Sequence, residues 1–375
     1  MLKIRGNKKE ILKAMQDANR AVPTKTTMEI LTFLLLEAND GELRIRGTNL
    51  DTTIDIAVDV TVEEGGAIAI NAKNTIEFIS KIDSEEISIE QKENDVIAIY
   101  YDMSEANLKG MNGEQFPNMP IVEKENEIKM NAVMLKEMIE KTTKACSTEE
   151  TRPILMGVLF DINNDNLTLV SLDGYRLMKS TKVIEGIKEN KKIVVPGKAL
   201  QNITKLIGND KDAEIEINYC SNHVEFNYMG TKIISRLLEG EYVNYNQIIP
   251  EKKDQPIKIK INAQKLKETV ERVSLLSEEK GTKLIDLQTK DNKMIITGGS
   301  AFGTAQEELQ FEGEGEIDIT FNSKFVTDAL DSYVGDCVLH MKTNTSPVII
   351  TEDGVEETTA LILPVRKKAV TATAA

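Results

Sequence analysis

Three lysines at near-equal intervals indicate that this chain is one long sequence unit written three times. Lys73, Lys198 and Lys324 stand 125 and 126 residues apart in a chain of 375 residues. Each lysine follows a strand-like segment and one small residue, and each opens a helical stretch: NAKNTIEFISKI, VPGKALQNITKLI and FNSKFVTDALDS. A repeat of this length is a whole domain and not one turn of a solenoid, so we expect three domains of ordinary size.

Three asparagines support the same division. Asn7, Asn131 and Asn262 each end a short strand-like segment and precede a helical pattern. Asparagine is a favoured N-cap because its side-chain oxygen accepts a hydrogen bond from a free backbone N–H of the first turn. Apolar residues follow four and eight positions after each asparagine, which places them on one helix face. These pairs are Ile11 and Met15, Leu135 and Ile139, and Leu266 and Val270.

A hairpin pattern follows the first helix of every repeat. Apolar and polar residues alternate around Leu43, Leu167 and Met294, and these segments are followed by Gly, Asn and Asp turn residues. Each repeat is therefore predicted to run strand, helix, strands, helix, strands, which is an α+β fold with two helices packed on antiparallel sheets. The predicted domains are residues 1–125, 126–254 and 255–366, followed by a disordered tail at 367–375.

Composition argues against catalysis. The chain has two histidines, His223 and His340, and three cysteines that lie far apart, so there is no clustered set of metal ligands and no obvious base for a nucleophile. The segment GGSAFG lacks the Lys-Ser/Thr ending of a phosphate loop and is predicted to be a hairpin turn. We therefore expect no metal, no cofactor and no catalytic residue.

Neither export nor membrane insertion is expected. The N-terminal segment MLKIRGNKKEILK carries charges throughout and lacks the apolar core of a signal peptide, which predicts a cytoplasmic protein. The longest apolar run, Ile30–Ala38, is too short to span a membrane and is predicted to be a buried strand.

The formal net charge of −15 argues at first against a nucleic-acid partner, because phosphate binding depends on Lys and Arg. The charges are unevenly distributed, however. Acidic residues gather in predicted loops and outer strands such as SEEISIEQKEND, whereas basic residues recur in the first helix of each repeat. A solvated helix face accounts for one such helix, but the same bias in three copies favours a basic surface with a function.

The chain resembles a known family over essentially its whole length up to Arg366. The segments that carry the resemblance are LEANDGELRIRGTNLD, FPNMP, TRPILMGVLFD, SLDGYRLM, RLLEGEYVNYNQIIP, LLSEEKG and LILPVR. Their order across three repeats is similar to that of the bacterial DNA sliding clamps, the beta subunits of the replicative DNA polymerase III holoenzyme. The resemblance implies a non-catalytic processivity factor in DNA replication. It also implies a head-to-tail homodimeric ring that encircles duplex DNA.

Helix spacing agrees with a ring of two chains. Six helices about 9 Å apart enclose a hole only about 17 Å across, whereas twelve enclose about 34 Å, which admits a DNA duplex. The resemblance implies that basic residues face the DNA, at Lys25, Lys73, Arg152 and Lys198, with Lys324 as the counterpart in the third repeat. The implied partners are duplex DNA without sequence preference, the replicative polymerase alpha subunit, the clamp loader and other clamp-binding replication and repair proteins.

The family also holds a hydrophobic pocket between its second and third domains, where partner proteins insert a short peptide. One wall corresponds to Leu172, Gly174, Tyr175, Arg176 and Leu177. The second wall corresponds to Val243, Gln247 and Ile248. The floor and rim correspond to Ser346, Pro347, Leu361, Leu363, Pro364, Val365 and Arg366. From the residues alone, these leucines would be assigned to an ordinary core.

The resemblance assigns Leu275 and Leu276 to one side of the dimer contact and Leu108 to the other. Two further functions stay open at the level of sequence. A three-domain scaffold could bind peptides without encircling DNA, and a carboxylate-based hydrolase would need an acidic pair confined to one cleft.

Overall fold

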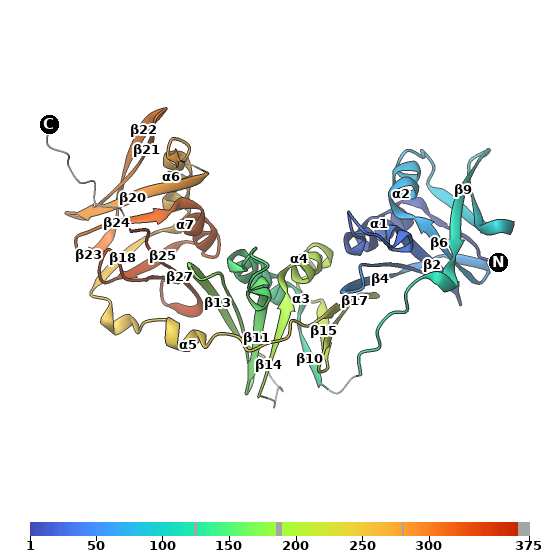
Figure 1. The fold of residues 1–375 in the computed structure, drawn as a ribbon, viewed down its shortest axis with the longest axis horizontal. Helices are drawn as coiled ribbons and strands as arrows, with labels where there is room; N and C mark the ends of the chain where they lie inside the picture. The colour runs from blue at the N-terminus through green and yellow to red at the C-terminus, as the bar shows by residue number, and fades with distance from the viewer. Residues whose placement is uncertain (124–125, 185–189, 280, 367–375) are drawn as a thin grey trace. The chain divides into compact units, whose positions relative to one another are not determined.

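The computed structural model describes residues 1–123, 126–184, 190–279 and 281–366 (Figure 1). The tail predicted at 367–375 lies outside these residues. The chain packs as two compact units, and the division between them runs through the second repeat. The first unit comprises residues 1–136 and 198–237, and the second comprises residues 137–197 and the chain from 238 onward.

One antiparallel sheet forms the first unit, with the strand order β10-β15-β16-β17-β4-β3-β2-β6-β9-β8-β7-β1-β5. From the first repeat come β1 Lys3–Asn7, β2 Phe33–Asn39, β3 Glu42–Thr48, β4 Thr52–Asp59, β5 Thr61–Glu64, β6 Gly66–Asn71, β7 Glu86–Gln91, β8 Val96–Tyr101 and β9 Ser104–Asn112. From the second repeat come β10 Asn126–Asn131, β15 Glu214–Tyr219, β16 His223–Tyr228 and β17 Thr231–Arg236. The sheet therefore continues from one repeat into the next.

Two sheets form the second unit, with the orders β14-β11-β12-β13-β27-β26-β25-β18-β23 and β19-β20-β21-β22, and β24 pairs with β20. From the second repeat come β11 Gly157–Asn163, β12 Asn166–Leu172, β13 Arg176–Val183 and β14 Asn190–Pro196. From the third come β18 Ile257–Asn262, β19 Glu278–Glu279, β20 Thr282–Lys290, β21 Lys293–Ser300, β22 Gly303–Gln310, β23 Glu312–Glu314, β24 Ile317–Asn322, β25 Asp336–Met341, β26 Val348–Glu352 and β27 Val355–Ile362.

The described residues form seven α-helices. They are α1 Lys8–Ala18, α2 Ala72–Ser80, α3 Ala132–Thr142, α4 Gly197–Leu206, α5 Tyr245–Ile248, α6 Ala263–Ser274 and α7 Ser323–Leu330. In the first unit α1 packs beside α2 and against β3 and β4, and in the second α6 packs beside α7 and against β20 and β21 (Figure 1). None of these helices is long and apolar enough to cross a membrane.

The predicted caps of the first helices are confirmed. The side-chain oxygen of Asn7 accepts a hydrogen bond from the backbone N–H of Lys9 at 2.9 Å, and Asn131 and Asn262 accept equivalent bonds at 2.9 and 3.1 Å. The six apolar residues predicted on the inner faces of α1, α3 and α6 are all buried. The three repeated lysines are likewise each the second residue of a helix, α2, α4 or α7.

The predicted hairpins are also confirmed, because β3 pairs antiparallel with β4, β12 with β13 and β21 with β22. In addition, two-residue turns join β2 to β3, β11 to β12 and β20 to β21, and both turn residues have positive φ in each. This geometry matches the twist of the flanking strands and is tolerated best by Gly, Asn and Asp. The turn residues are Asp40–Gly41, Asn164–Asp165 and Asp291–Asn292. The segment GGSAFG forms a hairpin turn between β21 and β22, as predicted.

The strand predicted at Ile30–Ala38 is only partly correct. The strand begins at Phe33, and Glu29–Thr32 form one turn of 3₁₀ helix. The Thr32 hydroxyl donates a hydrogen bond to the backbone carbonyl of Glu29 at 2.8 Å, which stabilises this turn. Such local bonds compete with strand formation, and apolar content alone does not reveal them.

Consecutive repeats are joined by one recurring strand pair. The last strand of the second repeat, β17, pairs with β4 of the first, and the last strand of the third, β27, pairs with β13 of the second. In its position within the repeat, β22 corresponds to β4 and β13. The last strand of the first repeat, β9, corresponds to β17 and β27. Among the described residues, β22 pairs only with β21, and residues 104–109 of β9 pair only with β8. In the described structure, β22 of the third repeat and β9 of the first therefore each have an edge that is not paired in the way that joins the other repeats.

Candidate functional site

Basic side chains gather on the helices. Across the seven helices there are twelve Lys and Arg against eight Asp and Glu, whereas the whole chain has 46 and 61. The predicted segregation of charge is therefore present in the folded chain.

The basic residues that the resemblance assigns to DNA are all exposed. Lys73, Lys198 and Lys324 stand in the first turns of their helices, and Lys25 and Arg152 lie in loops. The positive end of a helix dipole repels a lysine and attracts an anion, so a lysine in the first turn increases the attraction for phosphate. In the described part of the chain, Lys73 and Lys198 have no carboxylate within 4 Å, whereas the Lys324 ammonium lies 3.0 Å from Asp328.

Four residues that the resemblance assigns to the peptide pocket meet in one apolar cluster. Leu172, Leu177 and Leu361 are buried in this cluster, and Leu363 packs against it. Leu177 lies directly opposite Leu361 because β13 pairs with β27. The strand pair between the second and third repeats thus brings together residues that are far apart in the sequence.

The C-terminal segment runs from β27 past the loop at residues 173–175. The Leu363 N–H donates a hydrogen bond to the Tyr175 carbonyl at 2.8 Å, and the Val365 N–H donates to the Thr320 carbonyl at 2.8 Å. Pro364 and Val365 are half-buried and Arg366 is exposed. Gly174 has a φ of 93°, a conformation that favours glycine.

The remaining residues assigned to the pocket lie around α5 and before β26. Val243, Gln247 and Ile248 are exposed, and Tyr245 of the same helix is buried in the apolar cluster. Ser346 and Pro347 are half-buried and immediately precede β26, which pairs with β27. The cluster therefore has an exposed apolar border along α5.

Arg176 is held by bonds from three directions although only 8% of it is exposed. Its Nε lies 3.0 Å from the Asp173 carboxylate, its Nη1 donates to Asp328 Oδ2 at 2.5 Å, and its Nη2 donates to the Lys144 carbonyl. The guanidinium also lies 4.5 Å from the centre of the Phe325 ring. A buried arginine needs such compensation because removing its charge from water is costly.

The sequence predicted only part of this arrangement. Asp173 is the turn residue that its place in the repeat indicates, since its Oδ1 accepts bonds from the N–H groups of Tyr175 and Arg176. Phe325 and Asp328 were missed because α7 is about 150 residues further along the chain. The only sequence signal was the four-residue spacing of Lys324 and Asp328, which is typical of an ion pair on a helix.

The leucines assigned to the dimer contact are accessible. Leu275 is 71% exposed and Leu276 is 39% exposed at the C-terminal end of α6. Leu108 is half-buried on β9. Adjacent leucines at a helix end are often part of a core, and the exposure of Leu275 rules out that alternative for it.

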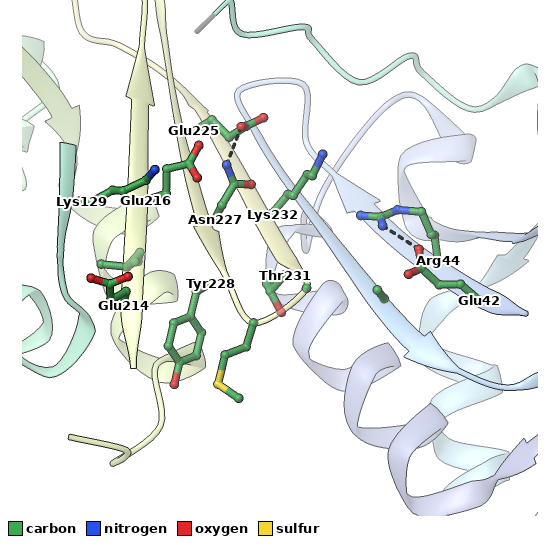
Figure 2. Close-up of a pocket in the computed structure, with 14 residues that line it drawn as sticks. Glu42, Arg44, Lys129, Glu214, Glu216, Glu225, Asn227, Tyr228, Thr231 and Lys232 are labelled. Atoms are coloured by element: carbon green, nitrogen blue, oxygen red, sulfur yellow. Dashed lines mark hydrogen bonds and ion pairs between the residues drawn. The ribbon is translucent and has the colours of Figure 1, made fainter. Parts of the chain in front are cut away.

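A depression of about 450 Å³ lined mainly by polar residues lies on the first unit, where β17 of the second repeat pairs with β4 of the first. Its lining side chains are drawn in Figure 2. Polar residues pair directly across four strands in its lining, namely Lys232, Asn227, Glu216 and Lys129. Asp55 and Arg46 continue this row on β4 and β3, outside the lining. Asp55 is fully buried and accepts bonds from Arg44 at 2.6 and 2.9 Å. Burial lowers the pKa of Arg44, but its bonds to Asp55 and Glu42 raise that pKa by more.

Two of the cysteines and one histidine are poorly suited to catalysis near neutral pH. Burial raises the pKa of the Cys146 and Cys337 thiols to about 12, so neither ionises near neutral pH. Burial, together with Lys252 and Lys258, lowers the pKa of His340 to about 4. No group of three or more His, Cys, Asp and Glu side chains in the described ranges is arranged to hold a metal ion.

Acidification should destabilise the second unit through His340. The pKa of its imidazole is about 4 in the folded chain against 6.5 for an ordinary histidine, so the unfolded chain takes up the proton first. This contribution to stability is complete above about pH 6.5 and is lost as the pH falls toward 4, with a loss of about 2 kcal/mol at pH 5. Urea unfolding of the wild type and His340→Gln from pH 7.5 to 5 checks this. The variant should show a shallower pH dependence, and identical slopes would contradict the assignment.

Comparisons with known proteins cover nearly the whole chain. Models of the DNA polymerase III beta subunit match residues 2–120 as its N-terminal domain, 129–244 as its central domain and 246–366 as its C-terminal domain. A beta sliding clamp from Staphylococcus aureus is 32% identical over 365 residues, which cover 94% of this chain and 96% of that protein.

Solved structures agree with this match. A DNA polymerase III beta subunit from Eubacterium rectale has 32% identity and a TM-score of 0.91, and the sliding clamp from Bacillus subtilis has 28% identity and a TM-score of 0.92. Each alignment covers 98% of this chain and 100% of the other. The chain therefore belongs to the DNA polymerase III beta subunit family, the beta sliding clamps, which are non-catalytic processivity factors of DNA replication.

Proposed function

We propose that two copies of this chain close head to tail into a ring around duplex DNA. The observation that carries the proposal is the strand pair that joins consecutive repeats, β17 with β4 and β27 with β13. The next pair in this series would join β9 of one copy to β22 of a second. Among the described residues, β22 and residues 104–109 of β9 each pair along one edge only. An exposed strand edge is a template for pairing with another chain.

A contact of this kind uses the β9 edge of one copy and the β22 edge of the other. Each copy therefore keeps one free edge of each type until the assembly closes. Two copies and two such contacts form a closed ring of six repeats. Leu275 and Leu276 at the end of α6 would then contact the side of β9 that carries Leu108. Their exposure in the single chain supports this assignment.

Within the ring we place five basic residues toward the DNA: Lys73, Lys198, Lys324, Lys25 and Arg152. The surplus of basic residues on the helices supports this orientation, because phosphates are attracted to a basic lining and repelled by the acidic remainder of the chain. Contacts to phosphate alone carry no sequence information, so the ring would slide. The domains would meet near residues 125 and 254.

We further propose that the apolar cluster around Leu177 and Leu361 binds short hydrophobic peptides of the polymerase alpha subunit, the clamp loader and other clamp-binding proteins. Tyr245 and Leu363 supply apolar surface, and Arg176 supplies a fixed hydrogen-bond donor beside it. Pockets of this composition bind partners through a few anchoring side chains. The site of action would be the bacterial cytoplasm, at the nucleoid.

Retention on DNA of different topology tests the ring. Protein loaded by a clamp loader should stay on a nicked circle through gel filtration in moderate salt and should be lost after the circle is cut once. Linear DNA with a bound protein block at each end should retain the ring, which controls for damage at the cut. Equal loss from intact and cut circles would overturn the proposal, since binding without encirclement does not depend on topology.

A further inference from the structure

One carboxylate oxygen on α7 is shared by two cations that belong to different proposed sites. Asp328 Oδ2 lies 2.5 Å from Arg176 Nη1 and 3.0 Å from the Lys324 ammonium. Arg176 is buried beside the apolar cluster, whereas the Lys324 side chain is 70% exposed at the start of α7. The Asp328 side chain is 18% exposed and lies between them.

The same helix also supports the wall of the proposed peptide site. The Phe325 ring lies 4.5 Å below the Arg176 guanidinium, and the Tyr175 ring stacks on Phe325 with a centroid distance of 6.4 Å. A shift of the Arg176 guanidinium would therefore disturb the aromatic pair as well. The position of α7 and the shape of this wall are linked through one ion pair and one stack.

We propose that Asp328 is a positioning residue for Arg176 and that it couples phosphate binding at Lys324 to peptide binding at the apolar cluster. The inference rests on the two sites proposed above. When a phosphate attracts Lys324, the full charge of Asp328 acts on Arg176, because an oxygen that accepts from one cation binds it more strongly than one that accepts from two. Arg176 is then held more firmly in the geometry that receives the peptide, which lowers the cost of binding.

The sign of the coupling follows from this competition. DNA in the ring should strengthen peptide binding, and bound peptide should strengthen the contact of Lys324 with phosphate by the same factor. The equivalent lysines of the other two repeats have no such partner among the described residues. Lys73 is followed four residues later by Glu77 without an ion pair between them, and Lys198 is followed by Asn202. Of these three lysines at helix starts, Lys324 is therefore the one that shares a carboxylate with a buried arginine in the described structure.

Fluorescence polarisation with a labelled short peptide that ends in Leu-Phe tests the coupling in the full-length chain. Asp328→Asn should weaken peptide binding about tenfold, the usual effect of losing a hydrogen bond to a charged group. Lys324→Gln should strengthen it about twofold to threefold, because it leaves Asp328 to Arg176 alone. The double variant should bind like Asp328→Asn, since Lys324 acts only through the carboxylate.

Lys265→Gln is the matched control, because Lys265 is an exposed lysine in the first turn of α6 in the same unit and the charge change is identical. It should leave peptide affinity unchanged. Asp328→Glu should recover part of the lost affinity, which a simple loss of folding would not explain. Duplex DNA should strengthen peptide binding by the wild type and not by Asp328→Asn.

The coupling is overturned if Lys324→Gln has no more effect than Lys265→Gln, or if Asp328→Asn binds the peptide as tightly as the wild type. A wild-type chain that does not bind the peptide at all would instead overturn the peptide site itself. Retention on circular DNA, measured in parallel on the wild type, tests the proposed ring independently of both results.

Discussion

Replacing Asp55 with alanine should destabilise the first unit by about 3–5 kcal/mol, the usual cost of removing one partner from a buried ion pair. Asp55 is fully buried, and its carboxylate accepts bonds from Arg44 and lies 3.3 Å from Arg46. Without it, two mostly buried guanidinium groups lose the carboxylate that they share and keep only the more exposed Glu42 and Glu37. Asp55 also lies opposite Lys232 of the second repeat, so the loss should reach the strand pair between repeats.

Hydrogen exchange and urea unfolding together would measure this effect. The protection of backbone amides from exchange should fall in β4 and in β17. The unfolding transition of the first unit should move to a lower urea concentration. Asp59→Ala is the matched control, because Asp59 is an exposed aspartate on the same strand and its loss should change stability by less than about 0.5 kcal/mol. If the unfolding transition of the first unit is unchanged in Asp55→Ala, the buried ion pair contributes little to the stability of this unit.

The second large effect is expected at the proposed dimer contact. Leu275→Asp with Leu276→Asp should weaken dimerisation at least about a hundredfold, because burying each leucine contributes about 1.5–3 kcal/mol and each carboxylate would have to be dehydrated. The exposed fraction of 71% indicates that the folded single chain tolerates a carboxylate at Leu275, and Leu276 is partly exposed at 39%. Sedimentation velocity at low micromolar concentration should show a monomer for the double variant and a dimer for the wild type.

Val334→Asp is the control for this prediction. Val334 is 89% exposed in the same unit, in the loop after α7, and carries no proposed contact. It should remain dimeric. If the Leu275→Asp/Leu276→Asp variant stays dimeric at the same concentration, these leucines are not part of the interface. If the wild type is a monomer, the proposed ring is wrong.

Helices and hairpins could be predicted from the sequence where the interactions that form them involve residues close together in the chain. Asn7, Asn131 and Asn262 cap their helices as predicted because a cap needs only the next three residues. The hairpins that follow Leu43, Leu167 and Met294 were predicted for the same reason, because their turn residues lie directly after the alternating segments. The 3₁₀ turn before Phe33 was not, since it depends on a bond from Thr32 to Glu29 that competes with an otherwise strand-like sequence.

The sites were less evenly predictable. Leu177 and Leu361 were assigned together only through the resemblance, because residue type alone cannot distinguish a groove lining from a core. The structure supplied the reason for their proximity, which is the pairing of β13 with β27. Asp328 and Phe325 could not be assigned from the sequence, since nothing near them in the chain indicates that they contact Arg176.

The sequence by itself determined the threefold repeat, the order of helices and strands within each repeat and the surplus of basic residues on the helices. These follow from spacing, capping and composition, which act over a few residues. Only the tertiary structure decided that the second repeat is divided between two compact units, that one strand pair joins successive repeats, and that Asp328 serves both Arg176 and Lys324. Those outcomes depend on which strand edges and charged groups meet across 100 residues or more, and local sequence does not encode that choice.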